Sequence, residues 1–299
     1  MKKPKIVFFG TGIVSLKTIE GICDRFEIEA IITKPDLVTS SGKTRPAELK
    51  VWAQEHNIDC FTPANRAELS QLFDKQKFDS QVGLVVDYGI IIAQDVIDSF
   101  PIGILNSHFS LLPQLRGADP ITFAILEGAQ ETGVTIMQIV AGLDEGDIVA
   151  QEKYSLRPDI TTPELTEDLI ALSNKMLVYT IPDYLSGQIK PHPQAGNPTY
   201  SRRLTKQDGR LDPSKSAAQL EREVRAYVGW PKSYFDWQGK TYIVHKANVA
   251  TAKIPKGELK VVDKKLFYGC KDGSLKILEI QPAGKPKMNA AAFINGYSI

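Results

Sequence analysis

Apolar runs of strand length alternate with segments of helical periodicity through the first half of the chain. Lys5–Phe9 is an apolar run that ends at Gly10, and Val82–Val86 is continuously apolar, as expected for a strand buried on both faces. In Val14–Cys23 the apolar residues recur at helical spacing. Similar patterns predict the other elements of this half: strands over Ile28–Thr33 and Gly103–Ser107, and helices over Ala47–His56, Arg66–Phe73 and Ala118–Leu126. The alternation predicts an α/β fold with a parallel sheet and helices on both faces.

Two further strands and a long helix follow. We expect Thr132–Gln138 and Asp147–Tyr154 at an edge of the sheet, and Pro163–Leu185 as a helix with proline in its first turn. Gly187–Tyr200 is rich in proline and glycine, a composition typical of a linker. We therefore predict a first domain over residues 1–186, a linker over 187–204 and a second domain over 205–299.

The second domain begins with an amphipathic helix and continues in short strands. Ser216–Val228 carries apolar residues on one side at helical spacing. Five short runs separated by Gly and by Lys/Asp turns predict strands over Ser233–Trp237, Thr241–Val249, Glu258–Val262, Lys265–Gly269 and Ser274–Ile280. Such a succession of short strands predicts a small β-barrel.

Composition narrows the class of protein. The length of 299 residues suits two domains, and 42% hydrophobic with 24% charged residues excludes wholesale disorder. The apolar runs fall short of the 18 or so residues that a membrane span needs, so we expect no membrane partner. The three cysteines lie far apart, at Cys23, Cys60 and Cys270, which excludes a CxxC pair and argues against a disulfide framework. We therefore expect a cytoplasmic protein in a reducing compartment.

The net charge of +1 hides an asymmetry between the two halves. Residues 205–299 hold 17 Lys and Arg against 9 Asp and Glu, a net charge of +8, which leaves −7 for residues 1–204. A basic domain suggests an anionic partner, and nucleic acid is one candidate. The alternative is that these basic residues form a solvated surface that binds no partner.

Polar residues gather where two strands are predicted to end. The strand Gly103–Ser107 leads into Asn106 and His108, which point to the same face because they are two residues apart. A Pro/Gly-containing turn follows them, and the later loop Gly142–Asp147 carries Asp144 between flanking glycines. In sheets of this type the active site lies beyond the carboxyl ends of the strands.

An amide, an imidazole and a carboxylate on neighbouring loops suit acyl transfer to an amine. Asn106 can donate to the carbonyl oxygen as it becomes an oxyanion, and His108 can donate to the same oxygen or move the proton of the attacking nitrogen. Asp144 can fix the tautomer of the imidazole. A lone Asn-x-His is more often structural, but the strand end, the turn and the glycine-flanked Asp144 together favour catalysis. The four histidines form no helical pair, so we expect no metal.

These motifs resemble those of the formyltransferases that use 10-formyltetrahydrofolate, and among them the methionyl-tRNA formyltransferase family. The resemblance covers nearly the whole chain. It rests on Asn106-Ser107-His108 and on the four segments Ser110–Pro113, Glu131–Gln138, Gly142–Asp147 and Leu278–Lys285, and also on Trp230-Pro231. It implies a Rossmann-like formyltransferase domain followed by a small OB-like barrel that helps to hold tRNA.

The resemblance also implies an activity and its binding residues. The chain would transfer a formyl group from 10-formyltetrahydrofolate to the amino group of methionyl initiator tRNA, as a monomer, with Asn106, His108 and Asp144 as catalytic residues. Folate would pack against two segments, which contain Tyr88, Gly89, Ile90, Ile92, Ser110, Leu111, Leu112 and Pro113. The tRNA would contact basic residues, for which the candidates are Lys43, Arg45, Arg202 and Arg203.

The chain departs from the family pattern at four places. Within the loop Leu37–Pro46, Ser41 stands where the family usually has arginine, and Asp87, Phe109 and Asp119 are also unusual. The contact with tRNA can therefore differ from that of the family. Three alternatives remain: a formyltransferase for another amine such as a nucleotide-linked amino sugar, a hydrolase that releases formate, and an inactive tRNA-binding homologue.

Overall fold

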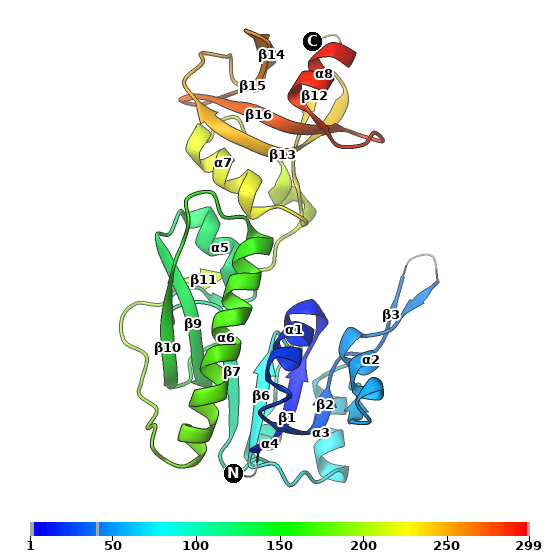
Figure 1. Cartoon of the computed structure of the whole chain (residues 1–299), viewed down its shortest axis with the longest axis vertical. Helices are drawn as coiled ribbons and strands as arrows, with labels where there is room; N and C mark the ends of the chain where they lie inside the picture. Colours follow the sequence, from blue (N-terminus) through cyan, green and yellow to red (C-terminus); the bar gives the residue numbers. More distant parts are fainter. Residues whose placement is uncertain (1–2, 40–41, 298–299) are drawn as a thin grey trace. The chain divides into compact units, whose positions relative to one another are not determined.

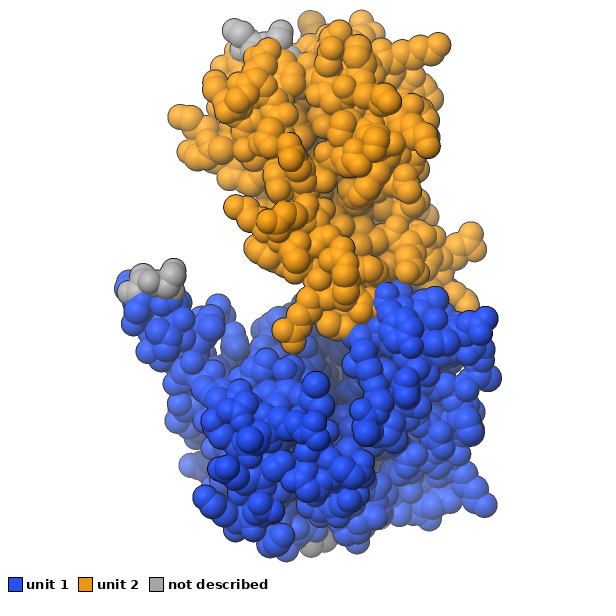
Figure 2. All heavy atoms as spheres, turned by 180° about the vertical axis from the view of Figure 1, so that it is seen from behind, with its two compact units in different colours: residues 1–117, 132–155, 166–200 blue, residues 118–131, 156–165, 201–299 orange. Residues whose placement is uncertain are grey.

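In the computed structural model, residues 3–39 and 42–297 are described, so Ser41 lies outside the described residues. The chain forms two compact units, coloured separately in Figure 2. The first consists of Met1–Gly117, Thr132–Ser155 and Thr166–Tyr200, and the second of Ala118–Glu131, Leu156–Leu165 and Ser201–Ile299. Two short segments of the first half thus belong to the second unit, and the boundaries at residues 186 and 204 stay a prediction.

The first unit is built on a seven-stranded sheet with the order β10-β9-β7-β6-β1-β2-β5 (Figure 1). The pairs β1–β2, β1–β6, β2–β5 and β6–β7 are parallel, whereas β7 pairs with β9 in the antiparallel sense. The strands are β1 (Lys5–Gly10), β2 (Glu27–Ile32), β5 (Asp59–Phe61), β6 (Val82–Val86), β7 (Ile104–His108), β9 (Glu131–Gln138) and β10 (Ile148–Ser155). The structure confirms the α/β fold and places β9 and β10 at one end of the sheet, with β10 as its edge strand; the strand at the other edge, β5, was not predicted, and the sheet is mixed rather than purely parallel.

Apolar side chains on both faces of this sheet pack against the helices. Val7 and Phe9 of β1 pack in one core cluster with Leu69, Phe73 and Val96, so their neighbours Ile6 and Phe8 point to the other face. The helices are α1 (Gly12–Ile22), α2 (Glu48–Glu55), α3 (Arg66–Lys75), α4 (Gln94–Asp98) and α6 (Thr162–Leu185). The positions of α1, α2, α3 and α6 follow the predicted periodicity to within a few residues, whereas α4 was not predicted.

Two further pairs of short strands lie outside this sheet. Within the loop Leu37–Pro46, β3 (Leu37–Val38) pairs with β4 (Thr44–Arg45), a hairpin that the hydrophobic pattern did not predict. The strand β8 (Arg116–Gly117) lies next to β11 (Tyr200–Ser201). The second of these pairings brings the end of the predicted linker back to the turn that follows His108.

The second unit contains an antiparallel sheet with the order β12-β13-β16-β15-β14, to which β17 adds on β16. All five predicted strands are present: β12 (Ser233–Trp237), β13 (Lys240–Ala250), β14 (Leu259–Val262), β15 (Lys265–Cys270) and β16 (Gly273–Pro282), with β17 (Met288–Asn289) in addition. The unit also holds α5 (Pro120–Glu127), a 3-10 turn η1 (Lys206–Gly209), α7 (Ala217–Ala226) and a C-terminal helix α8 (Ala290–Gly296) that the pattern did not predict. Phe235, Tyr242 and Phe293 lie in its buried core.

Candidate active site

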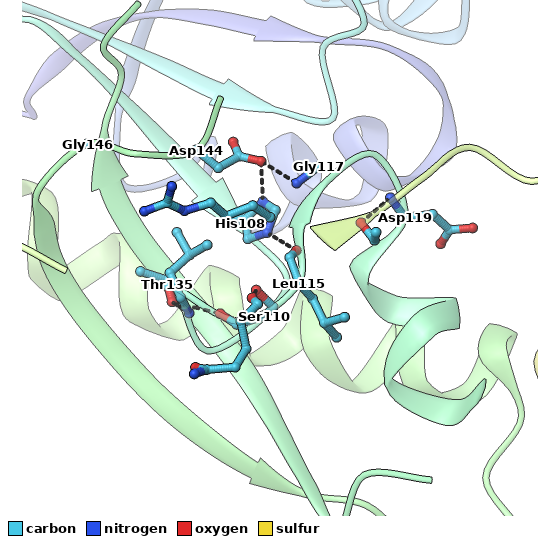
Figure 3. A network of polar contacts seen from close by, with 12 residues as sticks. His108, Ser110, Leu115, Gly117, Asp119, Thr135, Asp144 and Gly146 are labelled. Atoms are coloured by element: carbon cyan, nitrogen blue, oxygen red, sulfur yellow. Dashed lines mark hydrogen bonds and ion pairs between the residues drawn. The ribbon is translucent and has the colours of Figure 1, made fainter. Parts of the chain in front are cut away.

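The candidate catalytic residues meet at the carboxyl end of β7. Asn106 and His108 are both buried, with 9% and 6% of their surfaces exposed, and they occupy alternate positions of this strand. The loop after β9 brings Asp144 to the same place (Figure 3). The structure therefore brings together the three residues for which the sequence predicted a common site.

His108 has an oxygen atom at each ring nitrogen. Its Nδ1 lies 3.7 Å from Oδ2 of Asp144, and its Nε2 lies 3.0 Å from the carbonyl oxygen of Leu115. A carbonyl oxygen can only accept a hydrogen bond, so the Nε2–H group donates to Leu115. The carboxylate of Asp144 lies at ion-pair distance on the other side of the ring and is likewise an acceptor.

Both residues that face His108 have left-handed backbone conformations. The φ angle is +56° at Leu115 and +51° at Asp144, values that are uncommon for residues other than glycine and that cost about 1–3 kcal/mol each. Hydrogen bonds hold these conformations in place. Oδ2 of Asp144 accepts from the backbone N–H of Gly117 at 2.7 Å, and the N–H of Leu115 donates to Oγ1 of Thr199 at 2.9 Å.

The amide of Asn106 has no such partner. Among the described residues, its side chain makes no hydrogen bond, and only 9% of the surface of Asn106 is exposed. Its amide is therefore available to donate to an oxygen atom of a bound molecule.

A glutamine from the predicted linker joins the loops on either side of His108. Oε1 of Gln194 accepts from Nε and Nη2 of Arg116 at 3.2 and 2.8 Å, while Nε2 donates to the carbonyl oxygens of Asp144 and Gly146 at 2.7 and 2.9 Å. The guanidinium of Arg116 also pairs with Glu145 at 3.1 Å. A Cβ atom at Gly146 would lie 1.8 Å from the carbonyl oxygen of Gln138, so this loop needs glycine there.

The candidate folate residues fall into two groups. Side chains of Tyr88, Ile90 and Ile92 pack with the core cluster of the sheet, and Tyr88 contacts Phe9 edge to face at 5.7 Å between ring centroids. Burial raises the pKa of the Tyr88 phenol, and its hydroxyl has no hydrogen-bond partner among the described residues. Between them, Gly89 and Ile91 are exposed, Ile91 by 73%. The side chains of Tyr88, Ile90 and Ile92 thus pack into the core, whereas Gly89 and Ile91 are exposed.

The second group lies just after His108. Oγ of Ser110 donates to the carbonyl oxygen of Gln114 at 2.6 Å, and its own carbonyl accepts from Oγ1 of Thr135 at 2.7 Å. Leu112 and Pro113 are buried, whereas Leu111 is partly exposed. These contacts stabilise the turn that carries the carbonyl group of Leu115 to the imidazole.

The candidate tRNA residues are exposed and lie in both units. Lys43 and Arg45 are on or beside β4, and Arg45 pairs with Glu48 at 2.8 Å. Arg202 pairs with Asp208 and lies 6.0 Å from the ring of Phe123, whereas Arg203 is exposed. Arg203 and Lys43 are therefore the members of this set whose charge is least compensated by the contacts that the described residues make.

Two of the unusual residues have structural roles. Phe109 is buried, and Asp119 caps α5, since its carboxylate accepts from the N–H of Thr122. Burial is the main cause that raises the pKa of Asp119. In the part of the chain that the structure describes, no helix is long and apolar enough to cross a membrane, and no cluster of His, Cys, Asp and Glu could hold a metal.

Sequence reasoning missed the residues that support the site. Leu115, Arg116, Gln194 and Thr199 act mainly through backbone groups or through contacts across more than 70 residues of sequence. Such contacts produce no pattern of nearby residues in the sequence from which they could be predicted. Gln194 itself gave no signal either, because Gln188 and Asn197 are amides of the same segment.

The fold and the site together define the class of protein. The sequence model of the formyl transferase family matches residues 5–181, and that of the formyl transferase C-terminal domain matches residues 203–298. The chain belongs to the formyl transferase family and is a formyltransferase enzyme.

Relatives narrow the family further. The chain is 33% identical to the methionyl-tRNA formyltransferase of Myxococcus xanthus, covering 100% of this chain and 97% of the relative. It is 36% identical to that of Neisseria meningitidis, covering 99% and 98%. Among solved structures, the sugar 3N-formyl transferase WlaRD has a TM-score of 0.70 at 19% identity, covering 96% of this chain and 100% of that one. The methionyl-tRNA formyltransferase of Clostridium thermocellum has a TM-score of 0.54 at 16% identity, covering 82% and 93%. The two structural likenesses support the fold alone.

Proposed function

We propose that this enzyme transfers the formyl group of 10-formyltetrahydrofolate to the amino group of methionyl initiator tRNA. The observation that carries the proposal is the unpartnered amide of Asn106 beside an imidazole that faces Asp144. Full-length relatives at 33–36% identity bear the name methionyl-tRNA formyltransferase, which favours this acceptor over the sugar amines of enzymes matched at 18–19%.

Asn106 and His108 would stabilise the negative charge that grows on the carbonyl oxygen during transfer. The amide of Asn106 supplies one donor, and the Nε2–H of His108 supplies another when it turns from Leu115 to the substrate oxygen. The carboxylate of Asp144 and the carbonyl oxygen of Leu115 hold the imidazole from both sides, and the proton of the attacking amine passes to water or to His108.

The backbone around Gly89 fits a flat, polar heterocycle. Gly89, Ile90 and Ile91 make no backbone-to-backbone hydrogen bond with other described residues, so their N–H and C=O groups are available beside the site. Exposed Ile91 adds an apolar surface, a combination typical of small-molecule sites. Ser110–Pro113 lies next along the sheet. When bound there, 10-formyltetrahydrofolate supplies the activated formyl group.

The basic C-terminal segment suits an acceptor that carries phosphates. Its net charge of +8 belongs to residues 205–299, and Lys and Arg contacts to phosphates supply much of nucleic-acid affinity. We propose that Arg203 and Lys43 contribute such contacts, with Arg45 and Arg202 less able to do so because each pairs with an acidic residue. The enzyme would act as a monomer in the cytoplasm.

Steady-state formylation tests the proposal. We expect transfer to methionyl initiator tRNA, with a KM for tRNA that rises steeply with salt. Arg203→Ala should raise this KM several-fold and leave kcat within about 3-fold. The reason is that a lost phosphate contact weakens binding equally in the ground state and in the transition state. Arg66→Ala, which removes an exposed arginine at the start of α3, is the matched control and should change neither constant. Transfer to an amino sugar but not to tRNA would contradict the proposal.

A further inference from the structure

The predicted linker is held firmly against the first unit over residues 192–199. His192 exchanges two backbone hydrogen bonds with Ile148, at 2.8 and 3.0 Å. Farther along, the carbonyl oxygen of Thr199 accepts from the N–H of Arg116 at 2.9 Å, and its Oγ1 accepts from the N–H of Leu115. Residues 192–199 therefore run beside both loops that contact His108.

The side chain of Gln194 lies between these two loops and uses all four of its hydrogen-bonding positions. Its oxygen faces the guanidinium of Arg116, which can only donate, and its nitrogen faces two carbonyl oxygens, which can only accept. The orientation of the amide is thus fixed by its partners. No isosteric side chain can make the same four bonds, because a carboxylate has no donor for the two carbonyl groups.

Each loop that Gln194 joins supplies one of the two contacts of His108. Arg116 directly follows Leu115, whose carbonyl oxygen accepts from Nε2 of the imidazole. On the other side, Gln194 bonds the backbone of Asp144, whose carboxylate faces Nδ1. A displacement of either loop would change the position of the imidazole, and errors of about 1 Å in a catalytic geometry can cost about 100-fold in rate.

We infer that Gln194 is a positioning residue of the active site, which holds Asp144 and Leu115 at the distance that His108 requires. The inference rests on the proposed formyl transfer for its kinetic test only. Gln194 touches neither His108 nor the reacting atoms, so its effect passes through Asp144 and the turn at Leu115. The segment that composition marks as a linker is, in this part, a support of the catalytic centre.

Gln194→Glu is the sharpest substitution. It keeps the size of the side chain and an acceptor for Arg116, but it places an oxygen 2.7 and 2.9 Å from two carbonyl oxygens. We expect kcat to fall about 10- to 100-fold while both KM values stay within about 3-fold. Gln194→Ala removes the amide without placing an oxygen next to the two carbonyl oxygens. It is the variant to use if Gln194→Glu does not fold. Gln188→Glu, at an exposed glutamine just after α6, is the matched control and should leave kcat unchanged.

A double-mutant cycle separates positioning from general loss of stability. If part of the effect of Gln194 passes through Asp144, Gln194→Glu should cost several-fold less in the background of Asp144→Asn than in the wild type, because the ion pair that it supports there is already gone. An equal cost in both backgrounds would show that Gln194 acts independently of Asp144 and would overturn the inference.

A spectroscopic measurement tests the inference without any turnover. In ¹⁵N-histidine-labelled protein, Gln194→Glu should move the imidazole resonances of His108 and leave those of His56 and His245, while Gln188→Glu should move none of these. Unchanged His108 resonances would overturn the inference even if formyl transfer is established. Conversely, a wild-type protein that does not transfer formyl groups would contradict the proposed function and leave this outcome valid.

Discussion

Replacement of Asp144 by asparagine tests the electrostatic part of the site. The substitution keeps the shape of the side chain, and the amide oxygen can still accept from the N–H of Gly117, which lies 2.7 Å from Oδ2 in the wild type. The loop should therefore keep its conformation. What is lost is the negative charge 3.7 Å from Nδ1 of His108.

The size of the loss follows from the distance and the burial. When the imidazole is protonated, two unit charges 3.7 Å apart interact by about 4.5 kcal/mol at an effective dielectric constant of about 20. That value suits this pair because the exposed fractions of the two side chains are only 6% for His108 and 13% for Asp144. Hydrogen bonds to charged groups contribute about 1.5–3 kcal/mol, so we expect a loss of about 2–4 kcal/mol in transition-state stabilisation. This corresponds to a decrease of roughly 30- to 1,000-fold in kcat/KM.

The assay compares initial rates of formylation for Asp144→Asn and for Asp95→Asn, an exposed carboxylate on α4. The control should retain the wild-type rate, and both variants should keep the wild-type melting temperature within a few degrees. A value of kcat/KM within 3-fold of wild type for a folded Asp144→Asn protein would refute the electrostatic role assigned to Asp144.

Three further predictions concern a donor, a glycine and an ion pair. Asn106→Ala should lower kcat by about 10²- to 10³-fold with little change in melting temperature, as kinetics and calorimetry can show together. Gly146→Ala should destabilise the first unit by about 1–3 kcal/mol and slow catalysis, because the new Cβ would meet the carbonyl oxygen of Gln138; thermal unfolding that matches wild type would count against this. The hydrogen bond from Arg202 holds the pKa of Asp208 below its ordinary value, so this pair stabilises the fold above about pH 4 and its contribution fades as the pH falls. Asp208→Asn should therefore lower stability by about 1 kcal/mol at pH 7 and by progressively less in acid, as urea unfolding across pH would reveal.

Much of the fold could be predicted from hydrophobic periodicity. Strands such as Val82–Val86 are apolar throughout because both faces are covered, and α7 shows one apolar side because only one side is buried. The antiparallel direction of β9 could not be predicted, since strand direction depends on how the chain returns and not on the composition of the strand. The short helix α8 was missed because Ala290–Gly296 shows little periodicity.

The part of the candidate site that lies on one strand and one loop could be predicted from the sequence. Asn106 and His108 share a face because they alternate on β7, and the glycines around Asp144 mark a tight loop. The contact of Leu115 with His108 was not predictable, because it uses a backbone carbonyl whose direction depends on a φ angle of +56°. Gln194 could not be predicted for a related reason: two of its four hydrogen bonds go to backbone carbonyls 48 and 50 residues away in sequence, and the other two come from Arg116, 78 residues away.

Formylation of methionyl initiator tRNA by the purified protein tests the central claim most directly. The donor would be 10-formyltetrahydrofolate, and elongator methionyl-tRNA, free methionine and a nucleotide-linked amino sugar would serve as parallel acceptors. We predict rapid transfer to the initiator tRNA, strong dependence on His108 and Asn106, and little transfer to the other acceptors. Formate release without an acceptor, or transfer to the amino sugar alone, would contradict the account.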